Sequence, residues 1–234
     1  MKTDTDLLER GLEALGILSE PLRGRLVKYI EEIELWNPTY SLVNASGNEL
    51  VIRHILDSLA PLSLLKTMLS SLDTWDTSVQ TGKTANLADI GTGAGLPGIP
   101  LALALPDRNV FLVERMGKRV MFLENQKVIL GLHNVTILES EAERANGPFD
   151  LVVFRAFRPF TETRLFRSIA SHVSPGGIIA AYKGKHATAK EELDAISDDA
   201  RLGDFARSAE IIALNVPFLE EERCLVVMKN RVPD

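Results

Sequence analysis

Residues 88–100 read ADIGTGAGLPGIP, an apolar strand-like run that leads into three alternating glycines, Gly91, Gly93 and Gly95. Glycine turns after strands are typical of nucleotide sites, because glycine adopts backbone angles closed to other residues and lets the chain approach a ligand closely. The dinucleotide fingerprint G-x-G-x-x-G would need glycine at position 96, which is Leu96. A phosphate loop would need G-x-x-x-x-G-K-S/T, which the stretch lacks. The spacing therefore fits neither of the two commoner glycine-rich nucleotide sites.

The turn lies at the start of a long α/β pattern. From residue 86 onward, strand-like and helix-like runs alternate, and the last two strand-like runs, AEIIALN and RCLVVMK, have no helix between them. Such alternation predicts a mostly parallel, Rossmann-like sheet covered by helices on both faces, with an antiparallel hairpin at one edge. We predict a helical extension over 1–72, a polar, turn-rich linker over 73–85 and the α/β domain over 86–234.

The helical extension contains features that predict helix boundaries. Apolar residues at helical spacing occupy 5–35, and Pro38 is expected to end that helix because proline removes a backbone donor and disfavours helical angles at the preceding residue. A second helix is expected to start at Ser46, as the first residue of a capping box. On it, Arg53 stands four residues before Asp57, so the two form either a solvated ion pair or part of a substrate site.

Composition limits the classes of protein that fit. The 234 residues are 45% hydrophobic and 25% charged, and no run approaches the ~18 apolar residues of a membrane helix. The N-terminus lacks the apolar segment of a signal peptide, the single cysteine, Cys224, fits a reducing cytoplasm, and no cysteine–histidine cluster predicts a metal site. We expect a cytoplasmic monomer without a membrane anchor. Its net charge of −6 argues against a protein held to nucleic acid by overall field alone.

Two carboxylates near the glycine turn narrow the choice of ligand. Glu114 ends the next strand-like run, NVFLVE, where an acid typically accepts hydrogen bonds from the two hydroxyls of a ribose. Asp89 lies one residue earlier on its strand than the dehydrogenase pattern would use, where an acid can pair with a ligand's ammonium group. A ligand with an amino-acid end, a ribose and no pyrophosphate is S-adenosylmethionine. We therefore predict that the turn glycines and the two acids bind this cofactor.

The sequence also limits the atom that accepts a methyl group. After the fourth strand the chain reads VVFRAFRPF, which lacks the N-P-P-Y or D-P-P-Y type segment used to methylate amino groups of nucleic acids. Carbon-5 of a pyrimidine needs a cysteine nucleophile, for which Cys224 is badly placed, and no residue stands out as a base for an oxygen acceptor. N7 of guanine needs only alignment, since its lone pair is free and no proton is lost. The same lack of catalytic groups would fit a binding protein.

Basic residues gather at the predicted carboxyl ends of the strands, although the chain is acidic overall. They are Arg115, Lys118 and Arg119 after the second strand, Arg155 and Arg158 after the fourth, and Lys183 and Lys185 after the fifth. This local basic border predicts contact with RNA phosphates. Phe154, Phe157 and Phe160 are interleaved with the arginines, and they either stack an unpaired base or belong to the core.

Several segments together resemble one family. DIGTGAGLPGIPLAL, GKRVMFL, FDLVVFRAF, YKG and the upstream WNPTYSLV and RHILDSL are similar to the bacterial small-subunit ribosomal RNA guanine-N7 methyltransferases, also called glucose-inhibited division protein B. The likeness runs from Trp36 to Gly184. It implies a class I S-adenosylmethionine-dependent methyltransferase with an N-terminal helical extension, which forms 7-methylguanosine in 16S rRNA of the small ribosomal subunit.

The resemblance also implies roles for individual residues. Leu96 would contact the cofactor from the turn, and Ala142 and Glu143 would flank its adenine. Arg155 would bind the cofactor and act as the catalytic residue, closing the site near the methyl group and the substrate. The candidates that it implies for RNA contact are Arg53, His54, Lys118, Arg119 and Lys183, to which the basic border adds Arg158.

Other functions stay open on the residues alone. A small-molecule methyltransferase would share the cofactor site but would not need the basic border. A non-catalytic RNA-binding or ribosome-assembly factor would keep the cofactor as a structural ligand, and Leu96 disfavours a nicotinamide-dependent dehydrogenase. The chain departs from the family pattern at Ser41, Val43 and Phe154, which leaves the cofactor site untouched but weakens a substrate role for residues 37–44.

Overall fold

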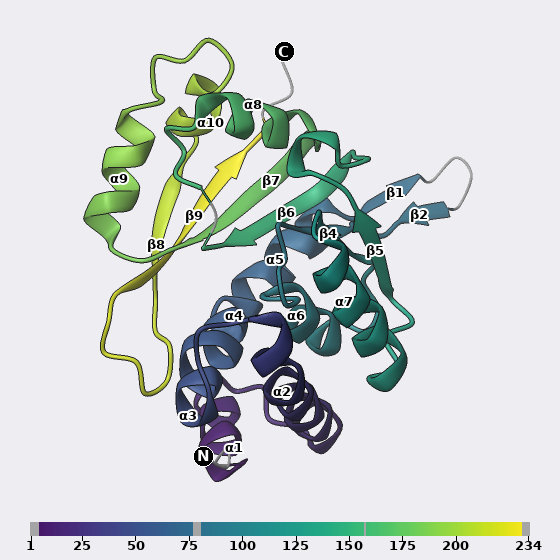
Figure 1. Cartoon of the computed structure of the whole chain (residues 1–234). Helices are drawn as coiled ribbons and strands as arrows, with labels where there is room; N and C mark the ends of the chain where they lie inside the picture. The colour runs from purple at the N-terminus through teal and green to yellow at the C-terminus, as the bar shows by residue number, and fades with distance from the viewer. Residues whose placement is uncertain (1–4, 77–80, 157, 231–234) are drawn as a thin grey trace.

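The computed structural model describes residues 5–76, 81–156 and 158–230, which form a sheet with helices on both faces (Figure 1). The main sheet has the strand order β5-β4-β3-β6-β7-β9-β8. Its strands are β3 Leu87–Ile90, β4 Val110–Glu114, β5 Val135–Glu139, β6 Phe149–Arg155, β7 Val173–Lys183, β8 Glu210–Leu214 and β9 Arg223–Lys229. Strands β3 to β7 run parallel, whereas β9 pairs antiparallel with both β7 and β8. The predicted parallel sheet with an antiparallel edge hairpin is confirmed.

Each face of the sheet has its own hydrophobic core, because alternate residues of a strand point to opposite sides. Leu151 and Val153 of β6 pack with the N-terminal helices, α6 and α7, while Val152 and Phe154 pack with α8, α9 and α10. These helices are α6 Gly98–Ala104, α7 Gly117–Ile129, α8 Thr163–Ser171, α9 His186–Asp194 and α10 Gly203–Arg207. The chain order reverses between β3 and β6, so the carboxyl ends of these strands border the crevice where such folds bind ligands.

The helical extension packs directly on the sheet. It consists of α1 Thr5–Ala14, α2 Glu20–Tyr40, α3 Gly47–Leu50, the π-helical turn Val51–Leu56, α4 Asp57–Leu59 and α5 Leu62–Leu72. Helices α2, α4 and α5 share one core with α6, α7 and the sheet, so the division into 1–72, 73–85 and 86–234 stays a prediction. The run Gly47–Leu72 is long and apolar enough to cross a membrane, contrary to our expectation. Half of its most apolar 18-residue stretch is, however, buried inside the molecule.

One of the two predicted helix boundaries is wrong. Helix α2 continues through Pro38 to Tyr40 and ends at Ser41, whose φ is 49°. Pro38 lies in the last turn, where the lost donor removes little helix, and the Asn37 side chain closes this end by accepting a hydrogen bond from a backbone N–H three residues past the helix, at 2.9 Å. The predicted helix start at Ser46 is confirmed, because Ser46 is the N-cap residue of α3. Its side chain makes no capping bond, however, so the predicted capping box does not form.

The predicted linker contains a short hairpin. Strands β1 (Thr74–Asp76) and β2 (Thr81–Lys83) pair antiparallel beside the main sheet (Figure 1). Strands of this length are too short for alternation of apolar and polar residues to reveal them. The segment is tied to the sheet by Asp150, which accepts hydrogen bonds from Lys83 at 2.9 Å and from the backbone N–H of Asn86 at 3.0 Å.

Candidate functional site

The glycine turn follows β3, an inner strand of the sheet. Gly91, Gly93 and Gly95 have φ angles of 71°, 61° and 93°, which residues with a Cβ atom disfavour. A Cβ atom on Gly95 would also lie 2.4 Å from the side chain of Ile99. Leu96, the next residue, is buried in the core behind the turn. The turn therefore depends on glycine, most strictly at Gly95.

Asp89 lies beneath the turn and holds it together. Its side chain is fully buried, and Oδ2 accepts hydrogen bonds from the Thr92 hydroxyl at 2.5 Å and the Gly98 N–H at 2.8 Å. Burial raises the pKa of Asp89 to about 6, and the two hydrogen bonds oppose that shift. Asp89 thus helps to build the turn, whereas its contact with a ligand's ammonium group stays a prediction.

Tyr29 of α2 holds the turn from the other side and was not expected from the sequence. Its side chain is fully buried, and its hydroxyl donates a hydrogen bond to the carbonyl oxygen of Ala94 at 2.7 Å. The two residues are far apart in the chain, so no local pattern shows the contact. The only sequence sign is a phenol next to Ile30 in an otherwise aliphatic helical stripe, because a buried tyrosine hydroxyl usually finds a partner.

Glu114, at the end of β4, faces the glycine turn. It is 4% exposed, and its carboxylate accepts hydrogen bonds from the backbone N–H groups of Gly93 at 3.0 Å and Met116 at 2.9 Å. Arg119, a candidate for RNA contact, places its Nη1 atom 3.7 Å from the same carboxylate. The backbone therefore fixes the orientation of Glu114, and Arg119 belongs to this pocket as well as to the basic border.

A cavity of about 920 Å³ opens beside Glu114, over the carboxyl ends of the strands. We name it the first cavity. Its lining includes four residues predicted to bind the cofactor, namely Gly91, Glu114, Ala142 and Glu143. The last two come from a 3-10 turn, Ala142–Arg144, that follows β5. Across residues 5–76, 81–156 and 158–230, no group of three His, Cys, Asp or Glu side chains is arranged to hold a metal ion.

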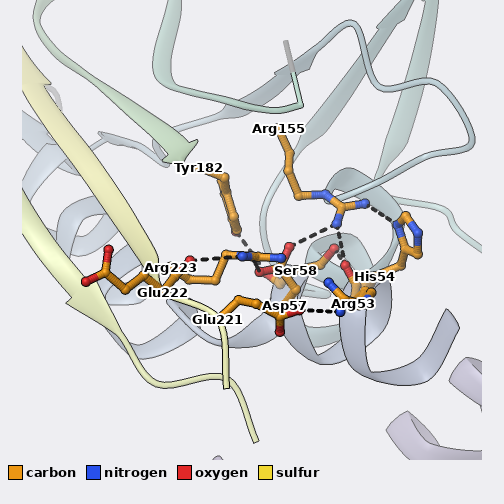
Figure 2. A network of polar contacts seen from close by, with 9 residues as sticks. All are labelled: Arg53, His54, Asp57, Ser58, Arg155, Tyr182, Glu221, Glu222 and Arg223. Atoms are coloured by element: carbon orange, nitrogen blue, oxygen red, sulfur yellow. Dashed lines mark hydrogen bonds and ion pairs between the residues drawn. The ribbon is translucent and has the colours of Figure 1, made fainter. Parts of the chain in front are cut away.

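Three neighbouring strands send side chains from their ends to one helical segment (Figure 2). Arg155 ends β6, Tyr182 lies opposite it in β7, and Arg223 begins β9. All three reach residues 53–58, in and just after the π-helical turn. We name this group the Arg155 junction, and its members are Arg53, His54, Asp57, Ser58, Arg155, Tyr182 and Arg223.

Acceptors from the helical segment surround the guanidinium of Arg155 (Figure 2). Nη1 donates hydrogen bonds to Asp57 at 2.9 Å and to the carbonyl oxygen of Arg53 at 2.8 Å, and Nη2 lies 2.8 Å from Nδ1 of His54. π-Helical turns are rare and frequent at functional sites. Here the turn presents a carbonyl oxygen to Arg155. The structure thus shows Arg155 anchoring the end of β6, and its catalytic and cofactor roles stay predictions.

Asp57 is the buried centre of the junction. It is 3% exposed, and besides Arg155 it pairs with Arg223, whose Nε lies 3.2 Å from Oδ1. Arg53 pairs instead with Glu221, on the loop before β9. The solvated ion pair between Arg53 and Asp57 is therefore wrong as an interpretation, because Asp57 faces the strand ends. Tyr182 completes the group by donating to the carbonyl oxygen of Ser58 at 2.8 Å.

His54 is neutral within this group. Burial, together with the charges of Arg155 and Arg53, lowers its pKa from 6.5 to about 4. Since arginine has no acceptor, neutral His54 accepts the hydrogen bond from Arg155. The junction borders a second cavity of about 500 Å³, whose lining includes His54, Arg155, Tyr182, Lys183 and Ala156.

Two of the three phenylalanines near Arg155 belong to the core. Phe154 is 2% exposed and Phe160 is 0% exposed, and their rings pack edge to face with centroids 6.4 Å apart. Stacking on a nucleobase is therefore the wrong interpretation for these two side chains. Phe157 lies outside the described residues.

The predicted RNA candidates occupy different environments. Lys118 is exposed at the start of α7, and Arg158 is exposed and pairs with Glu162 at 3.2 Å. Lys183 is largely covered, with Nζ 2.5 Å from Glu192 and 4.0 Å from the ring centre of Phe160. Two of the candidates, Lys118 and Arg158, are thus exposed, whereas the other four, Arg53, His54, Arg119 and Lys183, are half-buried. Contact with RNA stays a prediction for all six.

Comparison with known proteins identifies relatives over nearly the whole chain. The family model described as rRNA small subunit methyltransferase G matches residues 23–223. Proteins named ribosomal RNA small subunit methyltransferase G are similar throughout. The one from Treponema denticola is 34% identical over 95% of this chain and 93% of its own length. The one from Klebsiella pneumoniae is 34% identical over 95% of this chain and 96% of its own length. The one from Burkholderia thailandensis is 36% identical over 94% of this chain and 89% of its own length.

Solved structures agree on the fold. A SAM-dependent O-methyltransferase from Thermotoga maritima superposes with a TM-score of 0.53 at 16% identity, covering 88% of this chain and 72% of its own. A precorrin-8w decarboxylase from Methanobacterium thermoautotrophicum gives 0.50 at 20% identity, covering 80% and 93%. The predicted Rossmann-like methyltransferase fold is confirmed. The family model spans most of the helical extension, the glycine turn and all the strand ends that form the Arg155 junction, so this chain belongs to the rRNA small subunit methyltransferase G family.

Proposed function

We propose that this chain transfers a methyl group from S-adenosylmethionine to N7 of a guanosine in 16S rRNA of the small ribosomal subunit. The observation that carries the proposal is the first cavity, in which Gly91, Glu114, Ala142 and Glu143 come together at the crevice of a Rossmann-like sheet. The names of the relatives support an rRNA substrate, and the resemblance supports N7 of guanosine.

The donors and acceptors of the first cavity fit the cofactor. Glu114 is held by two backbone N–H groups, so its carboxylate is already oriented to accept the hydroxyls of a ribose. Gly93 leaves free space beside it, since an added Cβ atom would find its nearest neighbour, Arg119, only at 3.8 Å. Bound there, S-adenosylmethionine would supply a methyl group on a positively charged sulfur, which becomes a neutral thioether as the N7 lone pair takes the methyl.

The residues of this chain have a positioning task in that reaction. N7 carries a free lone pair and loses no proton, so no general base is required. What the protein must supply is alignment of the lone pair with the bond that breaks, and orientation of this kind can contribute roughly 7–11 kcal/mol. The glycine turn is assigned the placement of the cofactor. We assign the placement of the guanine base to the Arg155 junction and the second cavity.

The exposed basic residues are proposed to hold the RNA. Lys118 and Arg158 are exposed, and Arg158 also lines the first cavity, so a phosphate can reach both side chains. Contacts of this kind fix the position of the RNA and contribute salt-dependent affinity. A reaction on ribosomal RNA takes place in the cytoplasm. The monomeric state stays a prediction.

Mass mapping of rRNA tests the proposal. Small-subunit rRNA from cells without this protein should lack one 7-methylguanosine, which expression of the wild-type chain should restore. Restoration by purified protein and S-adenosylmethionine on isolated subunits would show that the transfer is direct. An identical set of methylated guanosines with and without the protein would refute the proposal, and turnover on a metabolite panel alone would favour a small-molecule methyltransferase.

A further inference from the structure

Ala156 has a backbone conformation that alanine rarely adopts. Its φ is 50°, in the left-handed region, and it directly follows Arg155 at the end of β6. A residue with a Cβ atom keeps this conformation only where its surroundings enforce it, and such residues cluster at functional sites. In the part of the chain that the structure describes, the other non-glycine residues with positive φ are Ser41 and Phe218.

Ala156 lies where the two cavities meet. It lines the first cavity, with Gly91 and Glu114, and it also lines the second cavity, with His54 and Arg155. Among the residues that the structure describes, the side chain that both cavities share is thus a single methyl group, and Ala156 is exposed. Any larger side chain at this position would reduce the space between the two cavities.

Ala156 lies between two anchored residues, Arg155 and Phe160. On one side, Arg155 is fixed by hydrogen bonds to Asp57 and to the carbonyl oxygen of Arg53. On the other side, Phe160 is buried, and its backbone N–H donates to Glu192 at 2.9 Å. These anchors belong to different layers of the molecule, because Asp57 comes from the helical extension and Glu192 from α9. They provide the constraint that a left-handed alanine requires.

The second cavity has the chemistry to seat a base. It borders the guanidinium of Arg155 and the neutral ring of His54, and unpaired bases in RNA complexes commonly stack on arginine planes and aromatic rings. Its volume of about 500 Å³ leaves room for a base and part of its ribose. A base placed there would face the first cavity across Ala156.

We propose that Ala156 is a positioning residue of methyl transfer, whose small side chain and left-handed backbone let a nucleobase in the second cavity reach a methyl group presented in the first. This inference rests on the proposed function. It assigns the acceptor to the second cavity and the methyl donor to the first, and it gives the Arg155 junction the task of holding the residue between them.

Substitution of Ala156 tests the proposal, with isolated small subunits that lack the methyl mark as substrate. Ala156→Val adds bulk and disfavours the left-handed backbone, so kcat should fall by about 100-fold, the effect of misplacing reacting atoms by an ångström. The dissociation constant of S-adenosylmethionine, measured by calorimetry, should stay within about threefold, because Glu114 and the turn are untouched. Asparagine tolerates a left-handed backbone, so Ala156→Asn adds side-chain volume and a polar amide with little backbone penalty, and kcat should fall by at least about tenfold.

Ser41 provides a matched control. Its φ of 49° equals that of Ala156 to within a degree, and it lies outside the lining of both cavities. Ser41→Val should therefore carry the same backbone penalty and leave kcat unchanged. If Ala156→Val does not fold, the kcat of Ala156→Asn alone tests whether Ala156 positions the acceptor.

Three outcomes would overturn the inference or its basis. Wild-type kcat in Ala156→Val or Ala156→Asn would show that the residue does not position the acceptor. A loss of cofactor affinity as large as the loss of kcat would show that Ala156 merely supports the first cavity. Absence of turnover in the wild-type chain would instead refute the proposed function. The reaction of the wild-type chain, run beside those of the variants, distinguishes that outcome from failure of the inference.

Discussion

The first cavity and the Arg155 junction lie on the same edge of the sheet but are built in different ways. The cavity is made by backbone: Gly91, Gly93 and Gly95 adopt positive φ angles, and Glu114 is oriented by main-chain N–H groups. The junction is made by side chains, with the buried carboxylate of Asp57 at its centre (Figure 2). The glycine turn beside the cavity is a local element, whereas the junction joins the helical extension to three strands.

This difference teaches which parts of the site tolerate change. A backbone-built pocket loses affinity when one of its acceptors is removed, but its shape persists. A junction that contains buried charges fails as a unit, since each charge left without its partner is costly. We therefore expect substitutions in the junction to affect stability, and removal of an acceptor side chain from the first cavity to affect cofactor binding.

Asp57→Ala should have the largest effect. It removes the carboxylate that Arg155 and Arg223 share, and breaking a buried ion pair costs about 3–5 kcal/mol of unfolding free energy. Denaturant unfolding measures the loss. Glu221→Ala is the control, because its ion pair with Arg53 is exposed and should contribute no more than about 1 kcal/mol. Equal losses of unfolding free energy in the two variants would contradict the claim that the buried ion pairs of Asp57 contribute more to stability than an exposed ion pair.

His54→Gln should change how stability depends on pH. The pKa of His54 is lowered from 6.5 to about 4 in the folded chain, so its contribution is fully present above pH 6.5 and is lost as the pH falls toward 4. The shift corresponds to up to about 3 kcal/mol. Glutamine keeps an acceptor for Arg155 but does not titrate, so this variant should lose less stability between pH 6.5 and 4 than the wild type. Parallel pH profiles would contradict the account.

Gly95→Ala should destabilise the protein more than Gly131→Ala, because Gly131 has open space around an added Cβ atom. Both Gly95 and Gly131 have positive φ, but an added Cβ atom would lie 2.4 Å from Ile99 at the first and would meet nothing within 4 Å at the second. Overpacking adds about 1–3 kcal/mol to the backbone penalty that both substitutions share. Thermal unfolding of the two variants gives the difference in stability directly. Equal losses of stability would mean that the turn shifts to accommodate the added Cβ atom.

The part of the first cavity around Gly91 and Glu114 could be predicted from the residues alone. Ala142 and Glu143 were predicted only from the family resemblance, and Thr163, Arg164 and Leu165 of α8, which also line the cavity, were not predicted. Glu114 and the glycines stand at strand ends, and the position of a strand end follows from short-range patterns. The junction could not be predicted. Its central pair joins Asp57 to Arg223, far apart in the chain, and depends on the register of β9 and on a π-helical turn that no pattern in RHILDSL shows. The Asp57 carboxylate therefore looked like the partner of its neighbour Arg53.

Phe154 and Phe160 show the same limit at the level of single side chains. Both stand beside arginines in the sequence, yet the first points to the α8 face of the sheet, as strand alternation requires, and the second joins it in the core. Tyr29 shows the reverse, since an apparent core residue proves to hold the glycine turn. Proximity in sequence is thus a weak guide to which side chains face a ligand.

Calorimetric titration of S-adenosylmethionine into the wild-type chain and Glu114→Ala tests the central claim most directly. If the first cavity holds the cofactor by its ribose, the variant should lose about 1–3 kcal/mol of binding free energy while its unfolding transition stays close to that of the wild type. Glu139→Ala, which removes the carboxylate opposite Glu114 on β5, should bind like the wild type, because Glu139 does not line the first cavity. Unchanged affinity in Glu114→Ala, or an equal loss in Glu139→Ala, would contradict the assignment.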